Sequence, residues 1–413
     1  MRLHHLSLTN FRNYTRLELA LPDGPVLLHG PNAQGKTSVL EAIYYLATSR
    51  SPWTSSDRQL LNWQVLDDPM PYFKISAEVD SQRRPLTRID ITLIKEMGED
   101  GIGRFKKDIR VNGLRRRTLD LLGEVNVVMF LPQDLSIIEG EPKLRRRYLN
   151  VALSQTDSAY VHALHNYDKA LEQRNALLRR ISSRKASPDE LVYWDNELVA
   201  AGSVLIAGRQ HFLRDLEGLA QQIHAELTGG VEVLTIQYQP SFAPKAKSSG
   251  QLSFEVRGLD LHRQLDPQEI EPQFRAALAD QQREEIARGI TLVGPQRDDL
   301  RFSVNDHDLG DYGSRGQART AVIAIKLAEL SWMHTVTGEW PILLLDELIA
   351  ELDQERRTYL LDRVGNATQS ILTTTEPDIF TRTFLDKAAV WSVQSGQIEP
   401  DSIEPENIGK PKE

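Results

Sequence analysis

The spacing of hydrophobic residues changes along the chain from an alternating to a helical pattern. Alternating leucines predict strands over about residues 3–8 and 17–21. From about 142 to 227 the pattern is helical, and five apolar residues recur every seven positions: Leu191, Leu198, Leu205, Phe212 and Leu219. This repeat predicts a helix of about 40 residues, on the order of 60 Å long. Its expected partner is a helix over 155–181, which together with it makes a short antiparallel arm.

The unbroken apolar run 342–345 predicts a strand that is buried on both faces, as in a central parallel sheet. Residues 26–29, VLLH, predict a second, short buried strand. Apolar residues at helical spacing predict helices over 36–47 and 318–332. The strand-rich pattern thus lies on both sides of the helical segment. We therefore expect an α/β protein into which a helical lobe with a short arm is inserted.

The insertion sets the expected domain boundaries. A loop is expected at 239–250, which is rich in proline, serine and lysine, and residues 252–290 predict a strand pair and then a helix that ends near Gly289. After Glu399, acidic residues and prolines predict disorder. The four expected parts are 1–135, the inserted lobe 136–289, 290–398 and the tail 399–413.

The segment from Gly30 to Thr37 reads GPNAQGKT and joins the predicted strand 26–29 to the predicted helix 36–47. Its glycines allow the backbone to fold around an anion, toward which the loop amides and the helix amino terminus point. In this context we expect Lys36 to reach the β and γ phosphates of ATP, and the Thr37 hydroxyl to hold Mg²⁺. The expected nucleotide ligands are Gly30, Pro31, Asn32, Ala33, Gln34, Gly35, Lys36, Thr37 and Ser38.

Two carboxylates, Asp346 and Glu347, follow the buried strand 342–345. Carboxylates at the end of a buried strand are costly unless they hold a metal or a proton in transit. Asp346 is therefore the expected Mg²⁺ ligand, directly or through water, and Glu347 the expected base for hydrolysis. The alternative is a strand end with solvated acids.

A second anion-binding segment is expected just before the helix 318–332. Ser314, Gly316 and Gln317 supply a hydroxyl and exposed amides at a helix amino terminus. An ordinary capped helix start is the alternative explanation of this pattern.

Composition narrows the possible classes. The 413 residues suffice for two or three domains. The absence of cysteine excludes disulfide and thiolate chemistry and favours a cytoplasmic setting. No signal sequence or run of roughly eighteen apolar residues was found, so we expect a soluble protein that does not bind membranes.

The net charge of −9 argues against a uniformly DNA-coating surface, although the basic residues are clustered. The first cluster consists of Arg104, Lys106, Lys107, Arg110, Arg115, Arg116 and Arg117. The second consists of Lys143, Arg145, Arg146 and Arg147, and the third of Arg174, Arg179, Arg180, Arg184 and Lys185. Such clusters fit sequence-independent binding of phosphates, and equally an ordinary solvated surface.

Taken together, these motifs resemble the RecF family over nearly the whole chain. The resemblance rests on the phosphate loop, YGSRGQART at 312–320, PILLLDELIAELD at 341–353, and three further segments: LSLTNFRNY at 6–14, FLPQDLSIIEGEPKLRRRYLN at 130–150 and TLVGPQRDDL at 291–300. It implies an ABC-type phosphate-loop ATPase head of the RecF and SMC group. Such a protein is expected to dimerise on ATP and to bind DNA at single-strand gaps or single-strand/double-strand junctions. It is also expected to act with RecO and RecR to load a recombinase.

The resemblance also implies roles for individual residues. ATP would lie between the phosphate loop of one subunit and Ser314, Gly316 and Gln317 of another. Gln133 would link the γ phosphate and Mg²⁺ to the helical lobe, Asp353 would contact the opposite subunit, and Arg12 would lie near the nucleotide. For these three residues a polar loop residue, a helix cap and a surface arginine are the respective alternatives.

The chain departs from related patterns at three places. Thr373, Thr374 and Thr375 stand where most ABC ATPases have a histidine, and because a threonine such as Thr374 can bond a phosphate without taking up a proton, slow DNA-stimulated hydrolysis is expected. Gln296 replaces the usual histidine of GPHRDD, and 51–53 reads SPW in place of SFR.

Two other classes of protein share such motifs. A transporter nucleotide-binding subunit would not carry so long and helical an insertion, and an SMC-type chromosome protein needs arms of hundreds of residues. Both therefore fit less well than a repair ATPase.

Overall fold

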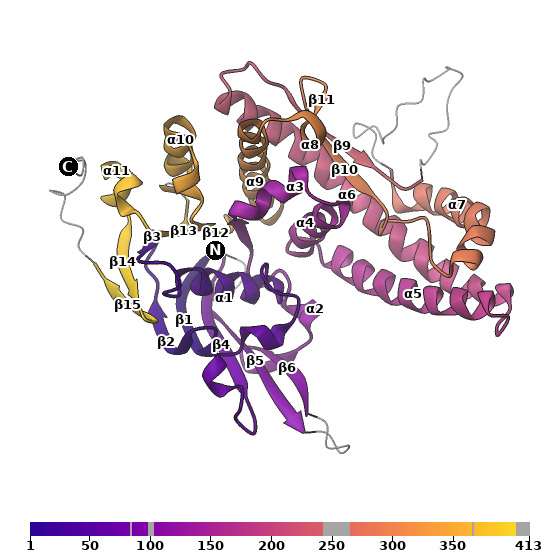
Figure 1. Cartoon of the computed structure of the whole chain (residues 1–413), viewed down its shortest axis with the longest axis horizontal. Coiled ribbons are helices and arrows are strands. Elements are labelled where there is room, and N and C mark those ends of the chain that lie inside the picture. The colour runs from indigo at the N-terminus through magenta and orange to yellow at the C-terminus, as the bar shows by residue number, and fades with distance from the viewer. Residues whose placement is uncertain (83–84, 98–102, 243–264, 366, 402–413) are drawn as a thin grey trace. The chain divides into compact units, whose positions relative to one another are not determined.

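The computed structural model describes the whole chain apart from residues 83–84, 98–102, 243–264, 366 and 402–413 (Figure 1). The chain forms two compact units, one made of 1–133 and 333–413 and the other of 134–332. The domain boundary expected from sequence at residue 289 falls inside the second unit. The strand pair expected after residue 252 falls largely on residues outside those described.

The first unit contains an antiparallel sheet and a mostly parallel one. The antiparallel sheet has the order β2 (Tyr14–Ala20), β1 (Arg2–Phe11), β4 (Tyr72–Asp80), β5 (Thr87–Met97), β6 (Gly103–Val111) and β7 (Leu114–Arg116). The other has the order β15 (Gln397–Pro400), β14 (Ala389–Gln394), β3 (Gly24–His29), β13 (Gln369–Thr374), β12 (Ile342–Asp346) and β8 (Val127–Phe130). The strands expected at 26–29 and 342–345 are confirmed as β3 and β12, and both are buried.

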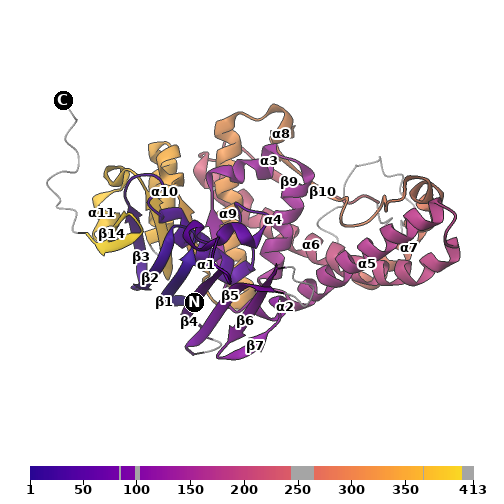
Figure 2. The ribbon, with the colours of Figure 1, turned by 60° about the horizontal axis from the view of Figure 1, so that its bottom comes forward.

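Helix α1 (Lys36–Thr48) contacts strands of both sheets (Figure 2). Its apolar residues, among them Val39, Leu40 and Ile43, are fully buried in one hydrophobic core with side chains of β1, β4, β12 and β13. Smaller helices of this unit are α2 (Thr118–Leu121), α10 (Gln354–Gly365) and α11 (Arg382–Leu385). Because α1 starts directly after the phosphate loop, this core fixes the loop between the two sheets.

In the parallel sheet, β3 lies between β13 and β14, which come from the other end of the chain. Leu27 is opposite Leu372 of β13 and Val390 of β14. This sheet is thus assembled from segments separated by more than three hundred residues. Strand β15 includes Pro400, which was expected to belong to the tail, and most of the expected tail lies outside the described residues.

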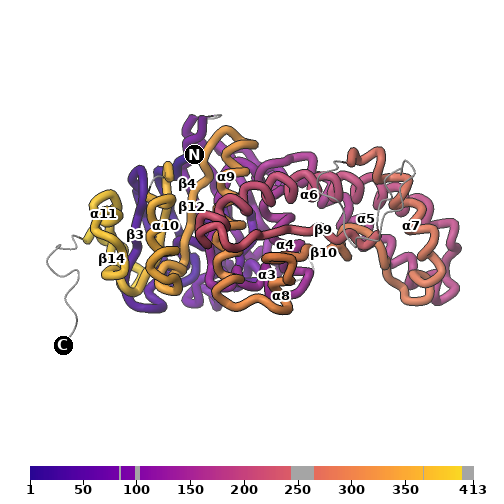
Figure 3. The backbone as a smooth tube through the Cα atoms, turned by 90° about the horizontal axis from the view of Figure 1, so that it is seen from above, coloured from indigo at the N-terminus to yellow at the C-terminus, as the bar shows by residue number. Residues whose placement is uncertain are grey.

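The second unit is mainly helical. Its helices include α4 (Pro142–Ser154), α5 (Ser158–Ser182), α6 (Leu191–Leu227) and α7 (Pro267–Arg288), with α3 (Ser136–Glu139) and α8 (Leu309–Tyr312) as short turns. Of these, α5, α6 and α7 run side by side (Figure 3). A small sheet has the order β11 (His307–Asp308), β10 (Asp299–Val304) and β9 (Leu234–Gln239). Helix α9 (Arg315–Thr337) begins in this unit.

The expected antiparallel arm is confirmed as α5 and α6, with α7 packed against both. Helix α6 has 37 residues, since its expected first turn, Pro188–Glu190, is a 3₁₀ turn capped by Ser187. Helix α5 begins later than expected because Asp157 caps it by accepting hydrogen bonds from the amides of Ala159 and Tyr160. Local capping residues therefore set the ends that hydrophobic periodicity leaves open.

Candidate nucleotide-binding site

The loop between β3 and α1 has the backbone of a phosphate cradle. Gly30 and Gly35 have φ of 147° and 116°, and a side chain is excluded at both. A Cβ on Gly30 would lie 2.4 Å from the carbonyl oxygen of Val393, and one on Gly35 would lie 2.5 Å from Nδ2 of Asn13. The glycines of the motif are thus required by backbone conformation and by close neighbours.

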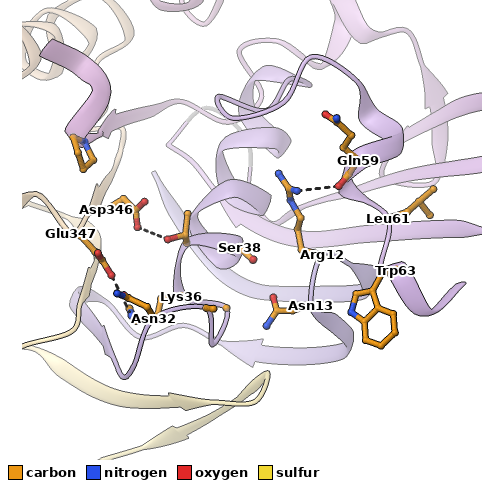
Figure 4. Close-up of a pocket in the computed structure, with 14 residues that line it drawn as sticks. Arg12, Asn13, Asn32, Lys36, Ser38, Gln59, Leu61, Trp63, Asp346 and Glu347 are labelled. Atoms are coloured by element: carbon orange, nitrogen blue, oxygen red, sulfur yellow. Dashed lines mark hydrogen bonds and ion pairs between the residues drawn. The ribbon is translucent and has the colours of Figure 1, made fainter. Parts of the chain in front are cut away.

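Lys36 lies at the start of α1 with only 3 % of its side chain exposed. Its Nζ donates to the carbonyl oxygens of Gly30 and Pro31 at 2.7 and 3.0 Å. The same nitrogen lies 3.3 Å from Oε1 of Glu347, which follows β12 (Figure 4). The ammonium group is therefore held over the mouth of the loop, where a bound phosphate would meet it.

Asp346 joins the acidic strand end to the phosphate loop. Its Oδ1 accepts a hydrogen bond from Thr37 Oγ1 at 2.8 Å, drawn in Figure 4, and another from Thr373 Oγ1 at 2.8 Å. A carboxylate beside a hydroxyl, with room for phosphate oxygens, is a donor set that Mg²⁺ accepts. Residues 309 positions apart are thus placed in direct contact.

Burial raises the pKa of Asp346, an effect opposed by the hydrogen bonds from Thr373 and Thr37. A carboxyl group whose pKa is higher in the folded than in the unfolded chain lowers stability once it ionises. Its contribution to the free energy of unfolding therefore falls as the pH rises above the ordinary pKa of 3.8 and through the raised value.

Asp346→Asn should therefore remove this pH-dependent loss of stability while abolishing ATP hydrolysis. The amide oxygen can still accept from Thr37 and Thr373, so the melting temperature at pH 7 should rise, by about 1–3 °C. Scanning calorimetry from pH 4 to 8 measures the effect. Asp68→Asn, which removes an exposed carboxylate, should leave both stability and hydrolysis unchanged. A lower melting temperature for Asp346→Asn would contradict the conclusion that ionised Asp346 destabilises the folded chain.

Arg12 is fixed beside the site by a carboxylate that the sequence did not single out. The guanidinium donates from Nε and Nη2 to both oxygens of Glu41 at 2.6 and 2.7 Å, and from Nη1 to the carbonyl oxygen of Gln59. Glu41 lies on α1 and is buried, and it also accepts a hydrogen bond from Ser51 Oγ. Ser51, the residue that SPW shares with SFR, thus supports Glu41 and through it Arg12.

Two further residues that were not expected, Asn13 and Tyr14, hold the loop itself. Asn13 Nδ2 donates to the carbonyl oxygen of Gln34 at 2.9 Å, and the Tyr14 hydroxyl donates to that of Gly35 at 3.1 Å. Both lie in the FRNY segment quoted above, so the motif was visible even though these roles were not.

Many of these groups line one pocket of about 620 Å³, which is large enough for a nucleotide. Besides loop residues it is lined by Arg12, Asn13, Asp346 and Glu347. Its remaining walls come from Gln59, Leu61 and Trp63, in a segment that sequence reasoning did not place at the site, and from Pro132, the neighbour of the expected site residue Gln133.

Three other expected site residues of this unit, Gln133, Thr374 and Asp353, are not among the residues that line this pocket. Gln133 is exposed and follows Pro132. The Thr374 hydroxyl is bonded to the backbone of Glu376, so its neighbour Thr373 is the threonine that reaches Asp346. Asp353 accepts a hydrogen bond from the amide of Arg356 at 3.0 Å and so caps α10. That bond and the Arg356 side chain lower the pKa of Asp353.

The second anion-binding segment lies in the other unit, at the start of α9. Helix α9 begins at Arg315, three residues before the expected start. The Ser314 amide donates to Gln317 Oε1 and the Gln317 amide to Ser314 Oγ, which makes a reciprocal cap. Nε2 of Gln317 donates to Glu232 at 2.8 Å. Ser314 and Gly316 themselves are exposed.

Two of the basic clusters include structural residues. Arg174 is fully buried and bonded to Asp195, Thr291 and Glu285, which corrects its expected place on a phosphate-binding surface. Arg145 is likewise buried and paired with Asp299. Exposed cations of the third cluster remain, at Arg179, Arg180, Arg184 and Lys185.

The motifs around Gln296 explain another departure. Gln296 accepts a hydrogen bond from the Tyr167 hydroxyl and donates to the carbonyl oxygen of Val293. Nearby, buried Arg209 bonds the Tyr160 hydroxyl and Asp298. These contacts place Gln296 inside the second unit, where its neutral amide both accepts one hydrogen bond and donates another.

The first basic cluster lies on β6, on β7 and at Arg117 just after β7, and nearby acids pair with several of its cations. Lys106 pairs with Glu96, and Lys107 pairs with Asp57. Arg115 pairs with Asp108, and Arg117 with Asp120. In the folded chain, Glu96, Asp57 and Asp120 therefore offset part of the positive charge of this cluster.

Comparison with known proteins places these features in a family. Residues 2–398 match the family described as RecF/RecN/SMC N terminal domain. The chain is 40 % identical to the DNA replication and repair protein RecF of Chloroflexus aurantiacus over 96 % of this chain and 99 % of that protein. It is 41 % identical to the RecF of Roseiflexus castenholzii over 97 % of this chain and 100 % of that one.

Solved structures agree on the fold. A structure described as the recombination mediator protein RecF with ATPrS, in the RecFOR pathway, matches with a TM-score of 0.82 at 29 % identity, over 97 % of this chain and 98 % of the other. An SMC head bound to the winged-helix domain of ScpA matches with a TM-score of 0.50 at 13 % identity, over 98 % of both. The expected ABC-type ATPase head is thus confirmed. Among the helices of the described residues, none is long and apolar enough to cross a membrane.

Proposed function

Because this chain belongs to the RecF family, we propose that it is an ATP-driven DNA-binding protein of replication and repair. The contact between Thr37 of the phosphate loop and Asp346 of the acidic strand end carries this proposal. It brings a hydroxyl, a carboxylate, Lys36 and Glu347 together around one pocket. That is the set of groups by which phosphate-loop ATPases bind and hydrolyse ATP.

In this proposal each residue has one task. Amides of the loop and the α1 amino terminus bind the phosphates. Lys36 gives up its hydrogen bonds to the loop carbonyls and donates instead to β and γ phosphate oxygens. Thr37 and Asp346 hold Mg²⁺, which neutralises charge on the phosphates when it is bound. Glu347 accepts a proton from the attacking water.

Hydrolysis needs a second copy of the chain in this scheme. The exposed Ser314 and Gly316 of one subunit face the γ phosphate bound by another, so ATP joins two subunits. Gln133 and Asp353 transmit the state of the nucleotide. After hydrolysis, charge repulsion and loss of the γ phosphate release the pair and reset it.

DNA is the proposed ligand of the closed dimer, at single-strand gaps or single-strand/double-strand junctions. RecO and RecR are the proposed protein partners, and the RecFOR pathway named for the similar ATPrS-bound structure supports them. An SMC-like role is less favoured, because the described arm helices have 25 and 37 residues.

Analytical ultracentrifugation and a phosphate-release assay test the proposal together. We expect a monomer without nucleotide, a dimer with a non-hydrolysable ATP analogue, and slow hydrolysis that gapped DNA accelerates. A chain that binds and hydrolyses ATP as a monomer with no response to any DNA would overturn it.

Binding to DNA should depend on ATP and fall steeply with salt. Each phosphate neutralised adds about −0.9 to the slope of log affinity against log salt on duplex DNA. Changing Arg115, Arg116 and Arg117 to glutamate should lower both the affinity and this slope, because three exposed cations on and beside β7 are replaced by anions. Fluorescence anisotropy between ~50 and 200 mM salt measures both quantities.

The matched control reverses exposed cations of the third cluster, at Arg179, Arg180 and Arg184. If this control loses DNA affinity while the variant of the first cluster keeps it, the DNA path runs over the arm and the assignment of the first cluster is wrong.

A further inference from the structure

One large aromatic side chain that lines the pocket is exposed to solvent. Trp63 has 71 % of its surface exposed, although tryptophan is usually mostly buried. It lines the same pocket as Lys36 and Asp346. Figure 4 shows it at the end away from Asp346 and Glu347, with Asn13 and Arg12 nearer to it than those acids. An exposed indole at this end has a face available for a ligand.

The backbone that carries Trp63 is firmly held, so the exposure of its side chain does not result from a loose segment. Trp63 opens a 3₁₀ turn (Trp63–Val65) whose cap, Asn62, is buried and accepts a hydrogen bond from the Gln64 amide at 2.8 Å. The Asn62 amide donates to the carbonyl oxygen of Asn10. Leu60 and Leu61, which precede it, are buried in the core of the unit.

The same anchoring relates Trp63 to the residues that hold the phosphate loop. The amide of Arg12 donates to the carbonyl oxygen of Leu60 at 2.8 Å, and Phe11 forms a β-bridge with Leu61. Asn13, next along, donates to the carbonyl oxygen of Gln34 in the loop. The distance between the indole and the phosphate cradle is therefore set by a short, hydrogen-bonded path.

We infer that Trp63 is the platform on which the base of the nucleotide stacks. This inference rests on the proposed ATP site and adds the position of the base to it. A nucleotide with its phosphates at Lys36 extends along the pocket, and the open face at its far end is aromatic. Stacking of a base on an indole needs no particular hydrogen bond, so Trp63 contributes affinity for any base, and more for the larger purines.

Trp63→Ala should weaken binding of MgATP by roughly 10-fold to 100-fold, the range that loss of one aromatic stack produces. It should leave binding of inorganic triphosphate unchanged, because that ligand has no base. Trp63→Phe should restore most of the affinity for ATP. The preference for ATP over CTP should shrink in Trp63→Ala.

Isothermal titration with MgATP, MgCTP and inorganic triphosphate measures these effects. Tyr193→Ala is the control, since Tyr193 is an aromatic residue of the second unit with 61 % of its surface exposed. If the wild-type chain binds neither ATP nor triphosphate, the proposed site itself fails. If ATP binds equally well to wild type and Trp63→Ala, only the base platform is wrong. Unchanged triphosphate binding also shows that each variant is folded.

Discussion

Glu347→Gln should slow ATP hydrolysis by roughly 10²–10⁴-fold, the usual contribution of a general base, and leave ATP binding intact. Glu347 follows β12 with φ of 50° and lies 3.3 Å from Lys36, so its carboxylate reaches the phosphate end of the pocket. The amide keeps the size of the side chain but accepts no proton at neutral pH. With hydrolysis blocked, the ATP-bound dimer should persist for much longer than that of the wild type.

Lys36→Ala provides the contrast to Glu347→Gln. It removes the ammonium group that meets the phosphates, so ATP binding itself should be lost, and with it dimerisation. Single-turnover hydrolysis and sedimentation, measured on both variants, distinguish a chemical defect from a binding defect. Hydrolysis by Glu347→Gln at the wild-type rate would show that another group serves as the base.

Ser314→Arg should abolish ATP-dependent dimerisation and leave the affinity of the monomer for ATP nearly unchanged. The exposed serine at the start of α9 offers its hydroxyl and the amides beside it to the nucleotide of another subunit. An arginine there adds bulk at the contact, whereas the phosphate loop of the same chain keeps all its groups. Sedimentation with a non-hydrolysable analogue gives the dimer fraction directly.

Ser182→Arg is a suitable control because it makes the same change at an exposed serine, at the end of α5. It should dimerise like the wild type. An unchanged dimer fraction in Ser314→Arg would rule out the arrangement in which ATP is held between two subunits. Loss of ATP binding by the variant monomer would instead point to a damaged fold.

Local sequence patterns predicted the parts of the site that depend on neighbouring residues. The phosphate loop, β3, β12 and the arm are all specified by spacing within a few turns or strands. Glu41 was missed because a carboxylate on α1 resembles a solvated helix residue, and it is buried only when Arg12 and Ser51 arrive from other segments. Trp63 was missed because nothing in its own segment indicates the pocket.

The basic clusters show the opposite error. A run of arginines predicts an exposed, charged surface. Arg174 is nevertheless buried and paired with Asp195 and Glu285, which lie on other helices. Charge along a sequence says how many cations are present, whereas their partners depend on tertiary packing. The same holds for Arg115 on the β6–β7 hairpin, whose partner Asp108 is reached only when the hairpin forms.

The position of β3 between β13 and β14 has a consequence for synthesis of the protein. A ribosome adds about 5–20 residues per second, so β3 waits for tens of seconds before its neighbours emerge. During this time the apolar side chains of β3 have no neighbouring strands to pack with. Contacts between residues so distant in sequence also form slowly. The helical unit, which lies within one continuous stretch, can fold first. We therefore expect nascent chains that stop before β12 to depend on chaperones and to be unable to bind ATP.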